Sequence, residues 1–582
     1  MSNDNTNDKP AGDPDNATHA AWAKAWSHLS PESALMAWTD WASHLAVSPH
    51  KRADLLQLAQ RQFEQMMAHL RDSLDSLAEG NTPPELPATD DRRFSDPAWG
   101  QYPFSLLRQS FEMQTHWWDQ ATQGVWGVDS GHQKFVQFAA RQWLEAMSPT
   151  HFPLLNPQVL ERTRAEEGNN LARGMSYLID DTMRRLAGEV PAGLEDFKVG
   201  QNLAITPGKV VYRNALIELI QYAPSTPDVH PEPILIVPAW IMKYYILDLS
   251  PQNSLIKYLV EQGHTVFCIS WNNPGKEDRH LGMDDYLAQG IDEALAAINA
   301  IVPKQRIHAA GYCLGGTLLS IAAAALARDG DDRLASVTLL AAQTDFSEPG
   351  DLSLFINESQ IALLEAQMEE TGYLRADQMG GAFQMLRSYD MVWSRLTQEY
   401  LLGDRRPMND LMAWNADGTN MPAAMHSQYL RRMYLYNDLS GGRYLVRGRS
   451  ISLGDITVPI FCVGTTTDHV APWRSVFKIH LFSPAEITFA LTNGGHNAGI
   501  VSEPGRPRRH YRLHTRQQGE RYLAPDEWLE TAGRHEGSWW SSWVAWLNEH
   551  SGPPMKSSRV ALGGKRHPPL CNAPGTYVLK AC

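Results

Sequence analysis

A cysteine at position 313 stands between two close-set glycines, Gly311 and Gly315, in the stretch GYCLGGT. The run before it, RIHAAG, is typical of a short buried strand, and the alanine-rich run after it is typical of a helix. A thiol displayed on such a sharp turn could act as a nucleophile, because a thiolate attacks acyl carbons. The alternative is that a glycine-rich turn simply holds a small buried cysteine.

The spacing Gly-x-Cys-x-Gly matches the nucleophile elbow of α/β-hydrolases, with cysteine in place of serine. In that fold the acid and the histidine follow the nucleophile in chain order, each on a loop after a later strand. The loop TTTDHVAPW, which offers Asp468, comes directly after the apolar run VPIFCVG, and the loop NGGHNAG, which offers His496, comes directly after ITFALT. These positions predict a catalytic triad of Cys313, Asp468 and His496.

Each member of this triad would have its own task. His496 would take the proton of Cys313, and Asp468 would fix the imidazole tautomer and stabilise the imidazolium. Attack of a thiolate on a thioester gives another thioester, so the acyl group keeps its activation, whereas serine would trap it as a lower-energy oxoester. Cysteine therefore favours acyl transfer over hydrolysis, provided that water is kept out.

An oxyanion intermediate needs two backbone N–H donors. The first would be the N–H of Leu314, the residue after the nucleophile. The second would come from the loop after the first long strand, in VPAWIMKYY. The candidates in this loop are Ala239, Trp240 and Ile241.

Other polar side chains compete for these roles. Asp345, in AQTDFSEPG, also follows a strand and could supply the acid in a variant topology. His469 is adjacent to Asp468 and is expected to point elsewhere, and His308 inside a strand is expected to be a hydrogen-bonded core residue. Cys268 and Cys462 lie within strands and are expected to be small buried hydrophobes.

The elements that must position these residues form an alternating pattern. Continuous apolar runs at 233–238, 265–270, 306–311, 335–342, 458–464 and 487–492 are separated by helical segments. Such runs predict a mostly parallel sheet covered on both faces, the α/β class. Residues 343–457 are too long for a loop and rich in Met, Trp, Tyr and Leu, so we expect a helical cap over the sheet.

The region before the sheet has a different character. Residues 1–18 are polar and expected to be disordered, and residues 19–190 show helical periodicity interrupted by a Pro-rich break, EGNTPPELPATDD. Trp, Phe and Met stripes here, such as Phe111, Met113, Trp117 and Trp118, are expected to pack helices rather than hold a cofactor. We therefore predict an N-terminal helical domain over 19–190 and a catalytic domain over 191–582.

Composition narrows the function further. The 582 residues carry a formal net charge of −14, which argues against nucleic-acid binding because that needs a basic surface. Five cysteines are too few in a chain of this length for a disulfide framework. No run approaches the ~18 apolar residues of a membrane span, and the N-terminus lacks a secretory h-region. A cytoplasmic protein is expected. No HExxH, paired CxxC, Walker loop or GxGxxG unit occurs, so no metal or nucleotide cofactor is predicted.

Taken together, the motifs resemble those of polyhydroxyalkanoate synthases over about residues 90–582. The matching stretches include DRRFSDPAW, AITPGKVVYRNALIELIQYAP, ILIVPAWIMKYYILDLSPQNSLIKYLVEQGHTVFCISWNNP, GYCLGGT, TDHVAPW, GGHNAGIVSEP, GSWW and APGTYV. The family's Cys–Asp–His set falls on Cys313, Asp468 and His496. Two departures are VPAW, where many members have two prolines, and a tail with Cys571 and Cys582.

The resemblance implies an activity. Such enzymes join (R)-3-hydroxyacyl-CoA units into a polyester, release coenzyme A, and carry the growing chain as a thioester on the cysteine. Asp468 would either orient His496 or help to deprotonate the incoming 3-hydroxyl. The full N-terminal region resembles that of the single-subunit kind. Between short- and medium-chain monomers we expect short ones, chiefly 3-hydroxybutyryl-CoA. The resemblance further implies a homodimer at the surface of cytoplasmic polymer granules, together with granule-associated proteins and without a cofactor.

Two other functions remain to be separated from this one. A hydrolase of the dienelactone type also uses cysteine in a similar elbow, but such enzymes are far smaller and lack a large cap. A non-catalytic granule-coating protein would explain amphipathic N-terminal helices, but not the elbow and the triad.

Overall fold

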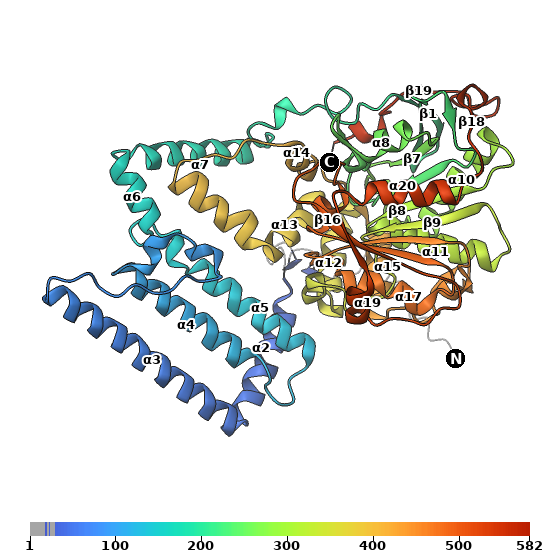
Figure 1. Cartoon of the computed structure of the whole chain (residues 1–582). Helices are drawn as coiled ribbons and strands as arrows, with labels where there is room; N and C mark the ends of the chain where they lie inside the picture. Colours follow the sequence, from blue (N-terminus) through green and yellow to red (C-terminus); the bar gives the residue numbers. More distant parts are fainter. Residues whose placement is uncertain (1–17, 20–21, 24–28, 582) are drawn as a thin grey trace. The chain divides into compact units, whose positions relative to one another are not determined.

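The computed structural model describes residues 18–19, 22–23 and 29–581. The disorder predicted for residues 1–18 falls outside this part of the chain, except for Thr18. The chain divides into two compact units (Figure 1). The first, here called the sheet unit, comprises residues 196–380 and 409–581 together with the described residues 18–19 and 22–23. The second, here called the helical unit, comprises residues 28–195 and 381–408.

The sheet unit is built on an 11-stranded sheet in the order β17-β16-β15-β14-β9-β8-β4-β7-β2-β1-β19. Its central strands run parallel: β4 (Ile234–Val237), β7 (Val266–Trp271), β8 (Ile307–Tyr312), β9 (Leu334–Leu340), β14 (Ile460–Thr465) and β15 (Ile487–Thr492). Antiparallel strands complete both edges: β1 (Gly208–Arg213), β2 (Ile217–Tyr222), β16 (His510–Arg516), β17 (Gly533–Glu536) and β19 (Cys571–Asn572). The predicted α/β-hydrolase fold with a mostly parallel sheet is confirmed.

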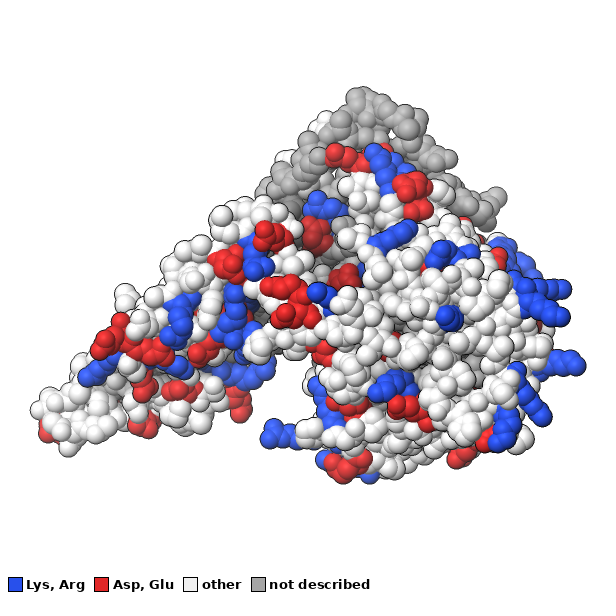
Figure 2. All heavy atoms as spheres, turned by 90° about the horizontal axis from the view of Figure 1, so that it is seen from above, with Lys and Arg blue, Asp and Glu red and all other residues white. Residues whose placement is uncertain are grey.

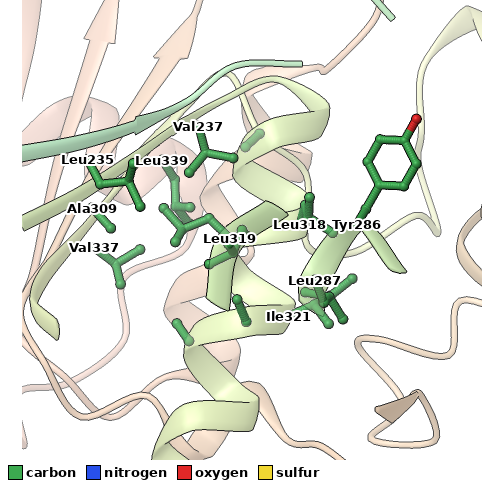
Figure 3. Close-up of a cluster of buried hydrophobic side chains, with 14 of the residues drawn as sticks. Leu235, Val237, Tyr286, Leu287, Ala309, Leu318, Leu319, Ile321, Val337 and Leu339 are labelled. Atoms are coloured by element: carbon green, nitrogen blue, oxygen red, sulfur yellow. The ribbon is translucent and has the colours of Figure 1, made fainter. Parts of the chain in front are cut away.

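The central strands are buried because both faces of the sheet are covered. Every residue of β4, β7, β8, β14 and β15 is buried, as their continuous apolar runs require. Helix α11 (Leu314–Arg328) starts at the elbow and packs on β8 and β9. Its Leu318, Leu319 and Ile321 belong to the buried core: Leu319 faces Val237 and Leu339 of the strands, whereas Leu318 and Ile321 face Tyr286 and Leu287 (Figure 3). This helix therefore fixes the elbow to the core.

Part of the long insertion between β9 and β14 stays in the sheet unit. It contains α12 (Glu358–Thr371), α14 (Asp410–Ala416), α15 (Ala423–Tyr429) and the π-helix η11 (Leu430–Leu435). Met421, Met425, Tyr429 and Met433 of this part are buried in the same core as the central strands. Helix α13 (Ala376–Leu386) leads out of it, and residues 381–408 belong to the helical unit.

The helical unit contains α2 (Pro31–Ala46), α3 (Pro49–Ala78), α4 (Phe104–Thr122), α5 (Ser130–Ala146), α6 (Pro157–Ala165) and α7 (Asn169–Ala187). Aromatic side chains pack these helices together: Trp38, Trp41 and Trp118 meet at ring distances of 5.4 to 6.5 Å, and Phe111 is buried. Acidic and basic side chains lie intermixed over this unit in the view of Figure 2. Pairs such as Arg162–Glu166 and Arg141–Asp119 account for part of this mixture.

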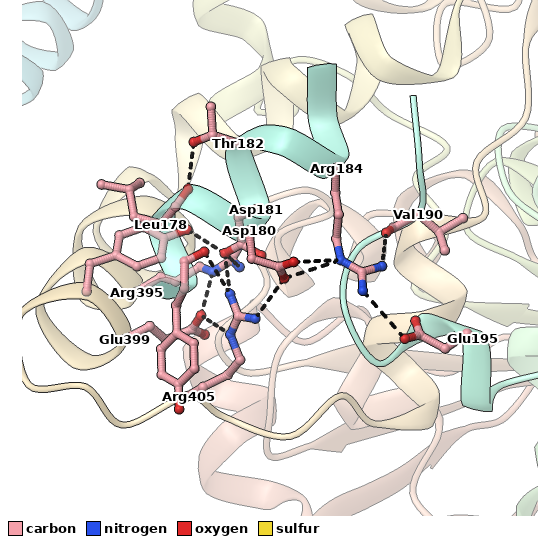
Figure 4. A network of polar contacts seen from close by, with 12 residues as sticks. Leu178, Asp180, Asp181, Thr182, Arg184, Val190, Glu195, Arg395, Glu399 and Arg405 are labelled. Carbon is pink, nitrogen blue, oxygen red and sulfur yellow. Dashed lines mark hydrogen bonds and ion pairs between the residues drawn. The ribbon is translucent and has the colours of Figure 1, made fainter. Parts of the chain in front are cut away.

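A cluster of charged side chains holds the inserted segment within the helical unit (Figure 4). Asp181 on α7 accepts hydrogen bonds from Arg395 (2.7 Å), Arg405 (2.5 Å) and the hydroxyl of Tyr400 (2.8 Å). Glu399, whose side chain is 7% exposed, pairs with Arg395 at 3.1 Å. We call these residues the Asp181 cluster. It fastens residues 395–405 to α7 although more than two hundred positions separate them along the chain.

Candidate active site

Cys313 occupies the turn between β8 and α11 in a backbone conformation that side chains rarely adopt. Its φ is 52° and its ψ is −122°. Such a conformation costs about 1–3 kcal/mol and persists only where the surroundings enforce it. Here the N–H of Cys313 donates to the carbonyl of Leu340 on β9 at 2.8 Å. The strained turn therefore displays the thiol at the carboxyl end of the central strands.

The glycines of the motif are required by close backbone contacts. A Cβ atom on Gly311 would lie 2.4 Å from the Cα of Gly316. A Cβ atom on Gly315 would lie 2.1 Å from the carbonyl oxygen of Val237 and 2.5 Å from that of Pro238. Both distances are far below van der Waals contact. The elbow can form only because these positions have no side chain.

His496 and Asp468 meet beside this elbow. Asp468 lies three residues beyond the end of β14, and His496, the first residue of α18 (His496–Ile500), lies four residues beyond the end of β15. Nδ1 of His496 lies 2.7 Å from Oδ2 of Asp468. The other carboxylate oxygen, Oδ1, accepts the N–H groups of Val470 and Ala471, each at 2.9 Å. The carboxylate is thus fixed in place by the loop that carries it.

The charges of the three residues support one another. Burial opposes ionisation of His496, but the negative charges of Asp468 and Cys313 and hydrogen bonds to both raise the pKa of His496 well above 6.5. Burial also opposes ionisation of Asp468, yet the charge and hydrogen bond of His496 lower the pKa of Asp468 below 3.8. The structure thus brings the predicted Cys313, His496 and Asp468 into one interacting group.

Tyr312, inside the elbow motif itself, is a neighbour that the sequence analysis missed. Its hydroxyl donates to Oδ1 of Asn497 at 2.5 Å, and its ring lies 5.7 Å from that of His496. Burial, followed by the charges of Cys313 and Asp468, raises the pKa of Tyr312 well above 10. The position of Tyr312 between Gly311 and Cys313 could have predicted this, because every residue of that turn lies near the thiol.

Two tyrosines of the insertion are within electrostatic range of the thiol. Burial is the main cause that raises the pKa values of Tyr429 and Tyr434, and the charge of Cys313 adds to it in both cases. Their rings lie 5.5 Å apart, and Phe346 lies 5.0 Å from Tyr434. These three side chains pack into one aromatic cluster, here called the aromatic wall, in which both tyrosines sense the charge of Cys313. Their sequence context gave no signal of this, because the insertion follows no motif that ties it to the elbow.

The predicted oxyanion donors lie on two adjacent segments. Leu314 is the first residue of α11, so its N–H belongs to the unpaired N-terminal turn of that helix. Ala239 and Trp240 are buried after β4, and Ile241 follows them. Strand β4 runs parallel to β8, with Val237 opposite Gly311. The loop after β4 therefore starts next to the elbow.

The competing candidates have other partners. Nδ1 of His308 lies 2.7 Å from Ser336 Oγ and Nε2 lies 3.0 Å from Ser551 Oγ, while burial lowers its pKa to about 4. The carbonyl of His469 accepts the N–H of Asp351 at 3.0 Å. His308 is thus the hydrogen-bonded core residue predicted above.

Asp345 contacts residues outside the triad. Burial opposes its charge, but hydrogen bonds from Ser347, Asn437 and Lys478 lower the pKa of Asp345 to about 2. These partners tie the loop after β9 to the insertion and to residue 478. We therefore assign the carboxylate of Asp345 to holding this loop in place.

The two strand cysteines are buried as predicted. Cys268 and Cys462 are both 0% exposed, and burial raises the pKa of each thiol. Among the described residues there is no group of three or more His, Cys, Asp or Glu that could hold a metal ion. No described helix is both long enough and apolar enough to cross a membrane.

Comparison with known proteins adds three family matches. Residues 90–259 match the family described as poly-beta-hydroxybutyrate polymerase (PhaC) N-terminus, and residues 10–51 match poly-beta-hydroxybutyrate polymerase N terminal. Residues 232–503 match the alpha/beta hydrolase fold. The last match covers the strands and loops that carry Cys313, Asp468 and the start of α18.

Individual relatives match over most of their length. A poly(3-hydroxyalkanoate) polymerase of Methylorubrum extorquens is 40% identical over 496 residues, which cover 84% of this chain and 81% of that protein. A poly(3-hydroxyalkanoate) polymerase subunit PhaC of Rhizobium etli is 39% identical, covering 86% and 78%. The corresponding subunit of Cupriavidus necator is 32% identical over 575 residues, covering 97% and 95%.

Proposed function

The chain belongs to the poly(3-hydroxyalkanoate) polymerase family, and we propose on this basis that it joins (R)-3-hydroxyacyl units of coenzyme A thioesters into a polyester. The observation that carries the proposal is the thiol of Cys313 on a strained elbow beside the His496–Asp468 pair. A cysteine there keeps the acyl group activated as a thioester. The enzyme is an acyltransferase.

The first half-reaction loads the cysteine. His496 takes the proton of Cys313, and the thiolate attacks the carbonyl carbon of the acyl-CoA. The N–H of Leu314 and one N–H from Ala239 to Ile241 stabilise the oxyanion that forms. The C–S bond to coenzyme A then breaks, and the imidazolium returns its proton to the departing thiolate. The products are free coenzyme A and an acyl group on Cys313.

The second half-reaction forms the ester bond. The 3-hydroxyl of a further hydroxyacyl unit attacks the thioester on Cys313 while His496 accepts the hydroxyl proton. Collapse of the tetrahedral intermediate breaks the bond to Sγ, and the thiolate regains a proton from the imidazolium. The chain has then grown by one ester. The aromatic wall of Phe346, Tyr429 and Tyr434 would limit the access of water to the thioester.

Asp468 acts through His496 in this proposal. Its Oδ2 accepts from the imidazole at 2.7 Å, and its Oδ1 is engaged by two backbone N–H groups. The side chain is 0% exposed. A carboxylate that is engaged at both oxygens orients and stabilises the imidazolium more readily than it takes up a proton from a second substrate.

The preferred monomer would be short, chiefly 3-hydroxybutyryl-CoA. Two of the matching families are described as poly-beta-hydroxybutyrate polymerases, which supports this choice. The enzyme would work as a homodimer at the surface of cytoplasmic polymer granules, in contact with other granule-associated proteins. Exposed apolar residues on α3, namely Leu56, Phe63, Leu74 and Leu77, support a location at an apolar surface.

Incubation of the full chain with (R)-3-hydroxybutyryl-CoA tests the proposal. The expected result is release of coenzyme A together with insoluble polyester. A hydrolase of the dienelactone type would release coenzyme A and leave free 3-hydroxybutyrate. A granule-coating protein would release no coenzyme A. Either of these two results would refute the polymerase proposal.

A further inference from the structure

The loop that supplies the second oxyanion donor also carries a buried lysine. Lys243 is 4% exposed and lies two residues beyond Ile241. An ammonium group is costly to remove from water unless hydrogen bonds replace its hydration. No step of the proposed reaction requires a positive charge at this position. Its contacts therefore indicate what the lysine does.

The ammonium group of Lys243 faces the last described residues of the chain. Nζ donates to the main-chain oxygen of Lys580 at 2.5 Å. Beside it, Nδ2 of Asn273, in the loop after β7, donates to the main-chain oxygen of Ala581 at 2.9 Å. The last described residues of the chain are thus bound by side chains from two loops at the carboxyl ends of the strands.

The rest of this C-terminal tail is anchored independently. Strand β19 pairs with β1 through Cys571 and Asn572. Glu218 on β2, which is 0% exposed, accepts the N–H groups of Thr576 at 2.8 Å and Tyr577 at 2.9 Å. The tail is therefore fixed upstream of Lys580. Its carbonyl oxygens offer Lys243 a stationary partner.

The main chain of the same lysine is bound to the insertion. The indole N–H of Trp414 on α14 donates to the carbonyl of Lys243 at 2.8 Å, and Met242 bridges to Gly418. Tyr245 donates its hydroxyl to Asp417 at 2.9 Å. Burial raises the pKa of Asp417, and the charge of Lys243 works against that rise. Insertion, tail and oxyanion loop thus meet at one residue.

We propose that Lys243 is a positioning residue that fixes the oxyanion loop by tying it to the C-terminal tail and to the insertion. This inference rests on the proposed function, because it concerns the donor from Ala239 to Ile241. The contact of Gly315 with Pro238 holds one end of the loop against the elbow. Lys243 holds the other end. Without it the N–H donor would drift from the oxyanion.

The test compares a reaction that needs the oxyanion hole with one that does not. Acylation of Cys313 by (R)-3-hydroxybutyryl-CoA develops an oxyanion, whereas alkylation of Cys313 by iodoacetamide does not. Because misplacement by about 1 Å can cost on the order of 100-fold, Lys243→Met should lower kcat for coenzyme A release by about 10- to 100-fold. The KM and the alkylation rate should stay near the wild-type values.

Three further variants sharpen the comparison. A chain ending at Leu579 removes the acceptor on Lys580 while the Glu218 contacts remain, so it should lose kcat as Lys243→Met does. The combined variant should be no slower than either one alone. Lys243→Arg, which keeps a cationic donor, should recover part of the rate. The exposed Lys565→Met serves as the matched control and should behave as wild type.

The results distinguish a failure of the positioning role of Lys243 from a failure of the proposed function. Unchanged kcat in Lys243→Met would overturn the positioning role, and so would a parallel loss of alkylation and acylation, which would indicate general damage. If Lys243→Met fails to fold, the chain ending at Leu579 decides by the same two rates. A wild-type chain that releases no coenzyme A would overturn the proposed function itself.

Discussion

Nδ1 of His496 lies 2.7 Å from Oδ2 of Asp468. The side chain of Asp468 is 0% exposed and that of His496 is 13% exposed. The pair is nearly closed to water, so their mutual attraction is little screened. Because Nδ1 of His496 is engaged by Asp468, Nε2 is the ring nitrogen that can exchange a proton with Cys313 or with a substrate.

Replacement of the nucleophile should abolish polymer formation. Cys313→Ala should lower coenzyme A release by at least about 10³-fold while leaving the fold intact. Without the thiol no acyl-enzyme can form, and His496 has no nucleophile to activate. Cys313→Ser should remain far below wild type, since an oxoester intermediate loses the activation of the thioester. Coenzyme A release and circular dichroism measure the two effects. Substantial turnover by a folded Cys313→Ala protein would end the assignment.

His496 should remain protonated above its ordinary range. Its pKa is raised above 6.5, so its favourable interactions stabilise the fold fully below pH 6.5 and are lost as the pH rises through the folded value. Asp468→Asn removes the main charge that raises this pKa and should shift the titration of His496 to lower pH. NMR of ¹³C-labelled histidine follows both titrations. An unshifted midpoint in Asp468→Asn would contradict the coupling.

Asp468→Asn should slow both half-reactions to a similar degree. The loss follows from imidazole orientation, which acylation and chain extension both need. Single-turnover acylation of Cys313 and the rate of polymer growth are measured separately on the same preparation. If acylation persists while extension stops, Asp468 instead serves the incoming hydroxyl.

The elbow should not tolerate a methyl group at Gly315. A Cβ there would lie 2.1 Å from the carbonyl oxygen of Val237, so Gly315→Ala must displace β4 or α11 and should cost about 1–3 kcal/mol or more. Gly380→Ala in helix α13 is the matched control, because no heavy atom lies within 4 Å of its added Cβ. Thermal unfolding of both variants provides the comparison. Equal melting temperatures would refute the close contact.

The exposed apolar face of α3 should bind polymer granules. Leu56 and Phe63 are 71% and 59% exposed, so replacing both with Gln should weaken granule binding with little effect on folding. Replacing the exposed Gln57 and Gln65 of the same helix with Ala is the control. Co-sedimentation with isolated granules measures binding. Undiminished binding of the Leu56→Gln, Phe63→Gln protein would assign these residues to another role.

The sequence predicted the sheet and the positions of the candidate triad because both obey local rules. Each central strand is a largely apolar run, and Cys313, Asp468 and His496 each lie within four residues of the end of such a strand. The antiparallel strands β1, β2, β16, β17 and β19 were not predicted. Charged residues, half-buried in β16 and exposed in β17, break the apolar pattern of those two strands, and Glu218 and Gln221 interrupt it in the fully buried β2. The contacts of Tyr434 and Lys243 depend on how the insertion and the tail return to the sheet, and no local pattern encodes such a return.

The Asp181 cluster has a consequence for how these enzymes can be recombined. Residues 381–408 lie in the middle of the sheet unit's sequence but fold with α7. A chimera that exchanges only residues 1–195 for those of a relative would pair a foreign α7 with the native Arg395 and Arg405. If the foreign helix lacks an acidic residue in place of Asp181, the positive charges around the buried Glu399 are no longer matched. An uncompensated buried charge costs about 3–5 kcal/mol. A functional crossover therefore has to transfer 381–408 together with the N-terminal helices, as two separate pieces of the gene.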